Sequence, residues 1–537
     1  MPERWKPRLP RWRGEAGFLS RAHRFPARRL LFVSLVTAVL LRAFAWAQKA
    51  VLFDDGPLFL AMAKAIRAGD FEAVLGHPYH PLYSIGVAFG TVLGLPPEAA
   101  AVSLSIGCAA AAVVFLFLFL RDAFGEEIAA IGAFLLAIHP RAVDFGSDIQ
   151  SDSLYMALFL GCVFGLFRCL RSPRCRTGVF TGVGIGLAFW TRPEGLGLVV
   201  VGLLLLVGHA FGGTAQRKKV VATALALVLG TILVVAPYVL AIQSERGEWM
   251  LTPKRSFATL LPFVEAPASA GGLVAGQATP TAVRVIGAPT PPRAIGAASA
   301  TDTPSGSWET LVEWFGTLLS AFRYDVVLLL GVGLWQCRGR PGMRGVFLAT
   351  IAIFYAAVLL GLASSAGYVS RRHALVPLLP LLGYAAMGVT GLAEALRRAL
   401  PQAAGTPARR GLCIGVVLAV VTGLALPADL APRRQQHAAL RAAAEWIEAG
   451  TLREGALATG RLRNAYYAGR RFEPLPAGSR ALALARLRHR GVAYVLVAEK
   501  EIRHLPWLEP LDTSLRLVHR AEERGEAASV FEFIGSR

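Results

Sequence analysis

Apolar runs of membrane-spanning length recur along most of this chain, and they restrict the fold more than any other feature. The chain has 537 residues, of which 54% are hydrophobic and only 17% are charged. A helix needs roughly 20 apolar residues to cross a bilayer, so several long apolar runs indicate a multi-span membrane protein. We predict about eleven spans, several of them short: 30–48, 99–120, 128–143, 153–170, 177–191, 195–211, 220–243, 318–337, 345–363, 374–396 and 411–427.

Basic residues outnumber acidic residues, 56 to 35, which gives a formal net charge of +21. In a soluble chain this excess would favour a nucleic-acid partner. Here the basic residues flank the apolar runs, as the positive-inside rule requires of cytoplasmic loops. We therefore predict the lipid bilayer as a partner, and no nucleic acid. The rule also decides one ambiguous segment, 79–94: if this segment does not cross, the most basic loops all fall on the cytoplasmic side.

This orientation divides the chain into domains. The basic N-terminus, 1–29, is predicted to be cytoplasmic and uncleaved, because no convincing A-x-A site follows the first apolar run. Residues 30–427 form the transmembrane domain, with interfacial helices in a first outer loop, 49–98, and a flexible outer loop at 244–317. Residues 433–537 combine an amphipathic helix with strand-like runs. The predicted fold class is an all-α multi-span membrane domain followed by a small soluble α/β domain on the outer side.

Acidic and basic side chains gather at the outer boundary on segments that are far apart in sequence. Asp54 and Asp55 directly follow the first span, and acids at a membrane boundary are costly unless they face water or a site. Arginine binds phosphate through its planar fork, and a carboxylate can accept a proton from an attacking hydroxyl. The pattern matches transfer of a sugar from a lipid phosphate to a hydroxyl. The other members of this set are His77, Tyr79, His80, Tyr83, Asp144, Asp148, Asp152, Arg192, Glu194, Arg371, Arg372 and His373.

Five motifs, in this order, resemble the glycosyltransferase C superfamily. The resemblance is greatest to the bacterial family 39 members, which include protein mannosyltransferases, and to the related lipid A aminoarabinose transferases and core galacturonosyltransferases. The motifs are FDDGPLFLAMAKAIRAGD, HPYHPLY, SDSLYMALFL, GVGIGLAFWTRPEG and SRRHALVPLLP, within about the first 400 residues. The stretch WIEAG…YYAGRRFEPLP…RGVAYVLVAE resembles the tail domain of many such proteins.

The resemblance implies an enzyme of the bacterial inner membrane. It would move a sugar from a polyprenyl-phosphate donor to a glycolipid, glycan or protein acceptor, with inversion at the anomeric carbon and without a nucleotide. Asp54 would be the general base, Asp55 stands where glutamate is more usual, and Asp152 takes the second acidic position. The implied contacts to the lipid phosphate or the sugar are Arg371 or Arg372, then Arg192, Lys64, His80 and Tyr83.

Simpler interpretations stay open for several of these residues. The acid pair could cap a helix that begins at Pro57. Arg192 and Glu194 could form a structural ion pair, and the arginines at 371 and 372 could extend to the interface only to reach water. The C-terminal arginines are typical of a solvated face. No cofactor is implied, and no ligand spacing links His77, His80 and His373 into a metal site.

Other features of the sequence exclude or weaken alternative functions. The six cysteines lie in predicted spans or inner loops, so no disulfide framework is expected. Gly178, Gly182 and Gly186 recur every four residues without a preceding strand, which favours close helix packing over a nucleotide loop. A transporter or flippase of lipid-linked sugars would predict internal repeats and polar residues at mid-membrane, and neither is clear. A non-catalytic assembly protein would leave the acid pair without a purpose.

Overall fold

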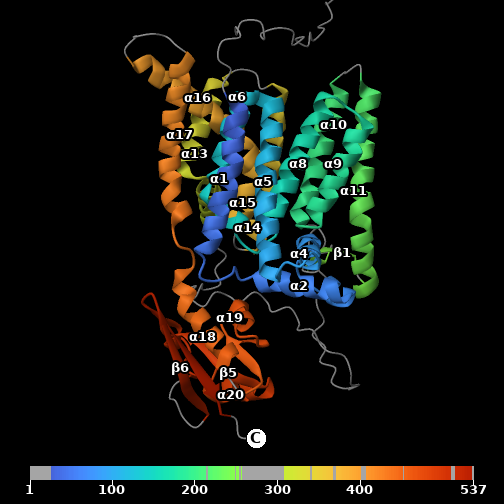
Figure 1. Ribbon diagram of the computed structural model, residues 1–537. Helices are drawn as coiled ribbons and strands as arrows, with labels where there is room; N and C mark the ends of the chain where they lie inside the picture. Colours follow the sequence, from blue (N-terminus) through green and yellow to red (C-terminus); the bar gives the residue numbers. More distant parts are fainter. Residues whose placement is uncertain are drawn as a thin grey trace, which may run out of the picture.

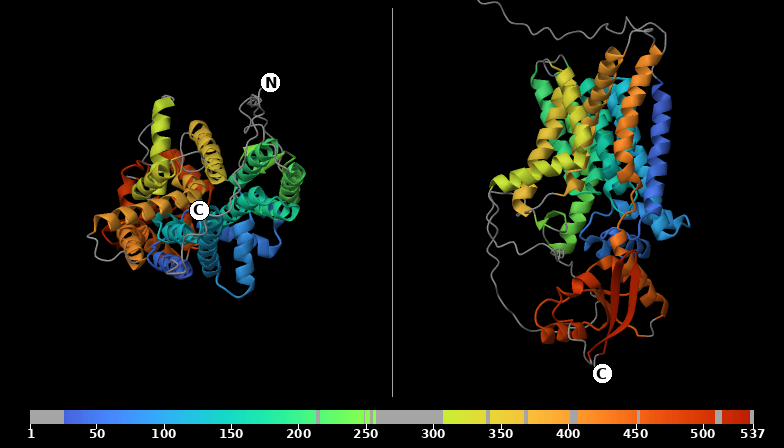
Figure 2. Two further views of the ribbon diagram at one scale, coloured as in Figure 1. Left: turned by 90° about the horizontal axis from the view of Figure 1, so that it is seen from above. Right: turned by 90° about the vertical axis from the view of Figure 1, so that its left-hand side faces the viewer.

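The computed structural model describes residues 26–212, 216–247, 249–252, 255–256, 307–338, 342–366, 370–400, 407–450, 453–508 and 514–534. Most of the basic N-terminus and most of the predicted flexible outer loop lie outside these ranges. Figure 1 shows a bundle of long helices, with a small domain of strands and short helices beyond one end of it. Figure 2 shows the same division from a second side.

Eight helices among the described residues are long and apolar enough to cross a membrane. They are α1 (Ala27–Ala47), α5 (Pro97–Phe124), α8 (Asp152–Arg171), α10 (Gly197–Phe211) with the 3-10 turn before it, α11 (Arg217–Arg246), α14 (Met343–Ala366), α15 (Arg371–Leu378) continuing into α16 (Leu382–Ala399), and α17 (Pro407–Leu430). The predicted fold class of a multi-span helical domain is confirmed.

Two further helix pairs reach membrane length only when both members are counted. The pair α6 (Glu126–Ala137) and α7 (Pro140–Gly146) is bent by 62°, and the pair α12 (Ser307–Phe322) and α13 (Tyr324–Gln336) by 89°. Pro140 opens α7, and proline lacks the N–H that would continue the preceding helix. By length and composition, the described residues thus contain up to ten spans. The fifth predicted run, 177–191, forms α9 (Cys175–Phe189), whose 15 residues are fewer than the roughly 20 that a crossing usually needs.

The first outer loop is helical but does not cross. Its helices are α2 (Gly56–Ala68), α3 (Phe71–Leu75) and α4 (Leu82–Val92). The longest of them, α2, has 13 residues, well below the roughly 20 needed to span a bilayer. Figure 1 shows α2 and α4 at the end of the bundle nearest the strand-containing domain. The interpretation of 79–94 as a non-crossing segment agrees with this arrangement.

The glycine stripe of α9 packs directly against α11. A methyl group added at Gly182 would overlap the backbone carbonyl oxygen of Leu227, and one at Gly186 would meet the Val234 side chain. The two helix backbones therefore approach as closely as small residues allow. The predicted packing role of the glycines is confirmed.

The C-terminal domain is built on one mixed sheet. It contains β3 (Ala456–Thr459), β4 (Phe472–Pro474), β5 (Val492–Ala498), β6 (Leu515–Glu523) and β7 (Glu526–Phe533), in the order β4-β3-β5-β7-β6. The first three are parallel, and β5, β7 and β6 pair antiparallel. The helices α18 (Ala438–Gly450), α19 (Leu462–Tyr467), α20 (Arg480–His489) and α21 (Glu499–Ile502) accompany them. The predicted α/β domain is confirmed.

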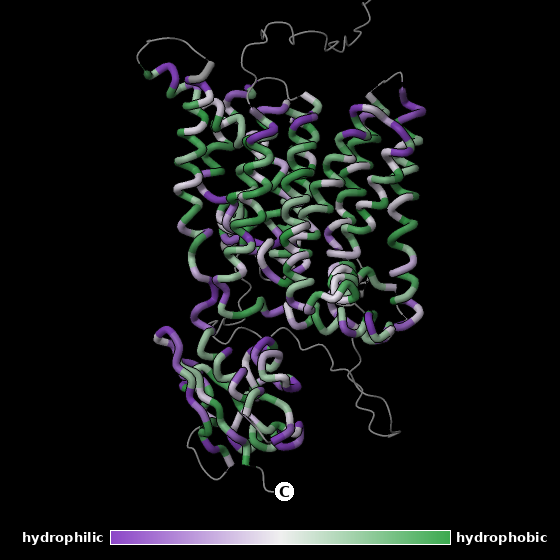
Figure 3. The backbone as a smooth tube through the Cα atoms, viewed as in Figure 1, coloured by the Kyte–Doolittle hydropathy of each residue, from purple (hydrophilic) through white to green (hydrophobic). Residues whose placement is uncertain are grey.

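One apolar cluster joins the first outer loop to this domain. Val51, Leu52 and Phe59 belong to the same buried cluster as Leu457 and Leu496. The basic helix ends lie at the opposite end of the bundle, where Arg171 donates to the carbonyl of Asp122 and Arg410 pairs with Glu127. Figure 3 shows hydrophilic segments at that end above a largely hydrophobic middle. The C-terminal domain and the basic loops therefore lie on opposite sides of the membrane domain.

Candidate functional site

The acid pair lies in the turn between α1 and α2, on the side of the C-terminal domain. Asp55 occupies the N-cap position of α2, but its side chain makes no capping hydrogen bond. Its Oδ1 instead accepts a hydrogen bond of 2.8 Å from the Tyr79 hydroxyl, and its Oδ2 faces the Arg372 guanidinium. Capping alone therefore does not explain Asp55.

Arg372 links the acid pair to the second acidic segment. Both terminal nitrogens of its guanidinium lie 3.3 Å from Asp55 Oδ2, and Nη1 lies 3.3 Å from Gln150 Oε1. Its Nε lies 3.9 Å from Asp152 Oδ1. The guanidinium also stacks 4.8 Å from the centre of the Phe53 ring. Ser370 caps α15 by accepting the Arg372 N–H, and this places the side chain at the start of the helix.

Asp152 has a second arginine partner. Arg192 Nη2 donates to Asp152 Oδ1 at 2.8 Å, and the two side chains are 10% and 2% exposed. Glu194 lies 3.8 Å from His373 Nε2 instead. Arg192 therefore pairs with Asp152, and not with Glu194 as the simpler interpretation of the sequence expected. Asp55, Arg372, Asp152 and Arg192 form one continuous chain of alternating charge.

Asp54 faces the C-terminal domain. Its carboxylate pairs with Arg461 and lies 3.0 Å from Arg463 Nη1. The Asp54 side chain is 35% exposed, whereas that of Arg463 is 3% exposed. Asp54 therefore keeps contact with solvent beside a buried guanidinium.

Asp148 lies in the hairpin between α7 and α8 and is fully buried. It pairs with Lys49 at 3.0 Å and with Arg434, and it accepts the backbone N–H groups of Phe53 and Ile149. One carboxylate thus connects the segment before Asp54 to the segment before Asp152. Bonds of this kind fix two loops relative to each other.

The surroundings shift the pKa of several groups in this region. Burial alone would raise the pKa of Asp148, but the charges of Lys49 and Arg434 hold its pKa below the ordinary value. Burial lowers the pKa of Lys49 despite the two nearby carboxylates. Burial and the Asp55 carboxylate raise the pKa of the Tyr79 phenol. Tyr79 therefore stays protonated and remains a hydrogen-bond donor.

Four of the predicted substrate contacts lie outside this network. Lys64 and Arg371 are exposed. His80 is buried with its ring against Phe189 and Tyr238. The Tyr83 hydroxyl is buried and bonds the Ala101 carbonyl and Ser105. Their roles toward a substrate stay predictions.

Several residues of the site were not predicted from the sequence. Arg434, Arg461 and Arg463 come from the C-terminal region whose arginines are expected on a solvated face, and Lys49 and Gln150 carry no motif of their own. The only sequence signal for the three arginines is their position in a predicted outer domain. Among the described residues, no group of three His, Cys, Asp or Glu side chains is placed to hold a metal ion.

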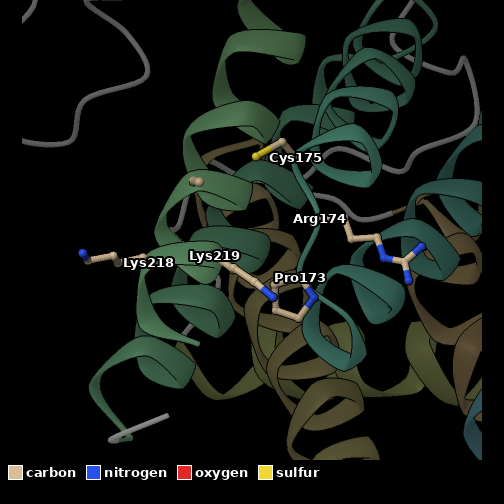
Figure 4. A pocket seen from close by; sticks show the side chains of 6 residues that line it. Pro173, Arg174, Cys175, Lys218 and Lys219 are labelled. Carbon is tan, nitrogen blue, oxygen red and sulfur yellow. The ribbon is translucent and has the colours of Figure 1, made fainter. Parts of the chain in front are cut away.

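A shallow cavity lies at the other end of the bundle, between the starts of α9 and α11. It has a volume of about 330 Å³ and is lined by Pro173, Arg174, Cys175, Lys218, Lys219 and Ala222. Figure 4 shows the Lys219 side chain pointing toward Pro173, while those of Lys218 and Arg174 point away from each other. The cations do not converge, so this cavity is not the candidate site.

Comparisons with known proteins address the family. Residues 76–240 match the sequence model of the dolichyl-phosphate-mannose-protein mannosyltransferase family. Among curated protein sequences, none matches the chain.

Solved structures match over nearly the whole chain. The apo oligosaccharyltransferase of Archaeoglobus fulgidus superposes with a TM-score of 0.58 at 13% identity, covering 89% of this chain and 70% of that one. ArnT of Cupriavidus metallidurans bound to undecaprenyl phosphate gives 0.57 at 12% identity, covering 94% and 97%. The chain has the glycosyltransferase C fold. The resemblance found in the five motifs is thereby confirmed for the fold.

The glycosyltransferase C fold is also seen in a third match. AglB of Archaeoglobus fulgidus, in complex with an inhibitory peptide and a dolichol-phosphate, gives a TM-score of 0.55 at 14% identity, covering 89% of this chain and 70% of that one. The mannosyltransferase family model matches residues 76–240, whereas the shared fold extends over 89% of the chain.

Proposed function

We propose that this chain is an integral membrane glycosyltransferase that moves a sugar from a polyprenyl-phosphate donor to a hydroxyl acceptor on the outer face of the membrane. The proposal rests on one observation above all: Arg372 reaches both Asp55 and Asp152 at the boundary next to the C-terminal domain. Acid and guanidinium groups thus converge where a lipid headgroup would lie. The solved relatives that hold undecaprenyl phosphate and a dolichol-phosphate support the donor class.

In the proposed reaction the acceptor hydroxyl attacks the anomeric carbon from the side opposite to the phosphate. Asp54 takes the hydroxyl proton as the new carbon–oxygen bond forms, an effect typically worth about 10²–10⁴-fold. The bond from the anomeric carbon to the phosphate oxygen breaks, and its electron pair stays on the lipid phosphate. A direct displacement of this kind inverts the anomeric configuration.

The arginines would stabilise the departing phosphate. Arg372 lies at the centre of the charged chain, and Arg371 directly precedes it in the same helix turn with an exposed side chain. Charge that develops on the phosphate is stabilised most by donors already in place. Arg192 would hold Asp152, and Asp152 would orient the acceptor or the acid pair. Asp55 is the alternative base, because it stands beside Asp54 and shares the same turn.

The orientation follows from the same proposal. The basic helix ends would face the cytoplasm under the positive-inside rule, which places the site and the C-terminal domain outside. We propose the bacterial inner membrane as the location. The acceptor would be a glycolipid, a glycan or a protein.

The test is to replace Asp54 and Asp55 singly by Asn in proteoliposomes supplied with radiolabelled polyprenyl-phosphate sugars (mannose, glucose, aminoarabinose and galacturonic acid). We expect transfer to fall by at least about 10²-fold at one position while donor binding is kept. Asp70→Asn is the matched control, because Asp70 is an exposed cap of α3 in the same loop and Asn caps equally well. Unchanged transfer in both site variants would show that neither aspartate is the base. If the unsubstituted protein moved the lipid-linked sugar across the membrane without forming a new glycosidic bond, a transporter would be favoured instead.

A further inference from the structure

The segment that leads into the acid pair, residues 48–54, has no regular structure of its own. It runs from the end of α1 to the turn before α2, and Val51 and Leu52 within it are buried. Buried backbone N–H and C=O groups need partners. In a segment without helix or sheet, those partners must come from elsewhere in the chain.

The partners come from the C-terminal part of the chain. Arg433, in the connection from α17 to α18, forms a parallel bridge with Lys49. The Ala50 N–H donates to the Arg433 carbonyl at 3.2 Å, and the Arg433 N–H donates to the Gln48 carbonyl at 3.3 Å. Gln435 Nε2 donates to the same Gln48 carbonyl at 2.8 Å. The connection therefore pairs with the segment almost as a strand would.

Side chains continue the pairing toward the acids. Arg441 donates to the carbonyl of Ala50 at 2.9 Å and Arg434 to that of Val51 at 3.3 Å. At Leu52 both backbone groups are bonded: its carbonyl accepts from Arg463 Nη1 at 3.1 Å, and its N–H donates to the Tyr467 hydroxyl at 2.9 Å.

Charge pairs extend the same contact to the acids themselves. Arg463 and Arg461 pair with Asp54, and Arg434 pairs with Asp148, which in turn accepts the Phe53 N–H. Every residue from Gln48 to Asp54 is thus bonded to the C-terminal region, either directly or through Asp148. Membrane-domain partners alone would leave the buried carbonyl and N–H of Leu52 without a bond.

We propose that the C-terminal domain is a positioning domain for the acid pair, and that Tyr467 and Arg463 are its positioning residues. They act through Leu52 and Asp54 rather than on a substrate. The catalytic consequence rests on the proposed glycosyltransferase function, whereas the ordering of the segment does not. A general base must be held within hydrogen-bond reach of the acceptor hydroxyl, so a looser segment lowers the rate of the chemical step more than it weakens donor binding.

The test compares Tyr467→Phe with Tyr466→Phe in the full chain, reconstituted in lipid nanodiscs. Each change removes one hydroxyl and keeps the ring. Tyr467 loses its bond to the Leu52 N–H, whereas Tyr466 loses a bond to Glu98 at 2.8 Å and touches no atom of the segment through its hydroxyl. Two quantities are measured: the hydrogen-exchange rate of the peptide containing Leu52, and kcat and KM for the radiolabelled polyprenyl-phosphate sugar that the unsubstituted protein uses.

We expect Tyr467→Phe to speed exchange at Leu52 and to lower kcat about tenfold while KM for the donor stays unchanged, since small displacements of a catalytic group cost this much or more. Tyr466→Phe should change neither quantity at the segment. Unchanged exchange at Leu52, or faster exchange with full kcat, would overturn the proposal. Arg463→Gln, which removes both the guanidinium that donates to the Leu52 carbonyl and the charge at Asp54, should lower kcat further.

The two proposals fail separately. If the unsubstituted protein transfers none of the supplied sugars, the glycosyltransferase function is in doubt. Faster Leu52 exchange in Tyr467→Phe alone would then still support the positioning of the segment by the C-terminal domain.

Discussion

Arg372 and Asp55 are 317 positions apart in the sequence, yet two guanidinium nitrogens of Arg372 lie 3.3 Å from Asp55 Oδ2. The contact joins the first outer loop to the start of α15. It also brings Asp152 within 3.9 Å of the same guanidinium. One arginine therefore connects two of the three acids of the site, whereas Asp54 pairs with Arg461 and Arg463 of the C-terminal domain.

The two adjacent arginines provide a direct test of this contact. Arg372→Lys should lower transfer by roughly 10²-fold, because an ammonium group cannot reach Asp55 and Asp152 together as a planar fork does. Arg371→Lys should have a much smaller effect, since Arg371 is exposed, Arg372 is the arginine that pairs with the two acids, and lysine keeps the charge. The measurement is the initial rate of sugar transfer with the polyprenyl-phosphate donor. The reverse ranking would assign the phosphate contact to Arg371 and leave Arg372 as a structural bridge.

The buried Asp148 should matter more for stability than the nearby Asp144. Removing one partner of a buried ion pair costs about 3–5 kcal/mol, and Asp148→Asn would leave Arg434 without its carboxylate and Lys49 with only the more distant Asp144. Asp144 is matched in its partners, with Arg433 at 2.9 Å and Lys49 at 3.9 Å, but its side chain is 20% exposed. Thermal unfolding in detergent should show a clear loss for Asp148→Asn and a small one for Asp144→Asn. Equal losses of stability in the two variants would mean that the burial of Asp148 does not make its ion pairs more important for stability.

Much of the fold was predictable because its signals are local. Apolar runs of 15 to 30 residues predict helices wherever they occur, and the glycines of α9 predict close packing from their spacing alone. The gathering of Asp55, Asp152 and Arg372 at one boundary was predicted from their places at the ends of the apolar runs. The bend between α12 and α13 was not predicted. It depends on Arg323 adopting a positive φ of 70°, and no pattern of side chains predicts that backbone conformation.

The contribution of the C-terminal domain to the site is the larger omission. Arg463 lies in a hydrophilic stretch, and an arginine in such a stretch is most often exposed. Its burial depends on Leu52, 411 positions earlier in the chain. Contacts of this range have no local signal, so the sequence alone favoured a solvated face. Lys49 and Gln150 were missed for the same reason.

The C-terminal domain should lose stability as the pH falls. Burial, followed by the charges of Arg463 and Arg461, lowers the pKa of His437 to about 4, against about 6.5 for an ordinary histidine. Between these values the unfolded chain binds a proton that the folded chain does not. The free energy of unfolding therefore falls as the pH drops from about 6.5 to about 4.

The measurement for this prediction is the thermal midpoint of the C-terminal domain against pH. His437→Gln should flatten the dependence between about pH 6.5 and 4, because the titrating group is gone. His489→Gln is the matched control, since His489 is exposed on α20. If the profile keeps its slope in His437→Gln, the loss of stability belongs to other groups.

The close approach of α9 and α11 yields the last prediction. Gly182→Ala should destabilise the membrane domain by about 1–3 kcal/mol, the usual cost of forcing an extra methyl into a packed interface. The reason is that the methyl would meet the backbone of α11 at Leu227, which cannot move aside as a side chain can. Gly415→Ala in α17 is the control, because nothing lies within 4 Å of the added methyl. There the better helix propensity of alanine should leave stability unchanged or slightly higher, by up to about 1 kcal/mol.

Thermal unfolding of both variants in the same detergent compares their stabilities. A Gly182→Ala protein as stable as Gly415→Ala would show that the two helices are free to separate. Because α9 ends just before Arg192 and Arg192 holds Asp152, a shift of α9 should also lower transfer in Gly182→Ala but not in Gly415→Ala.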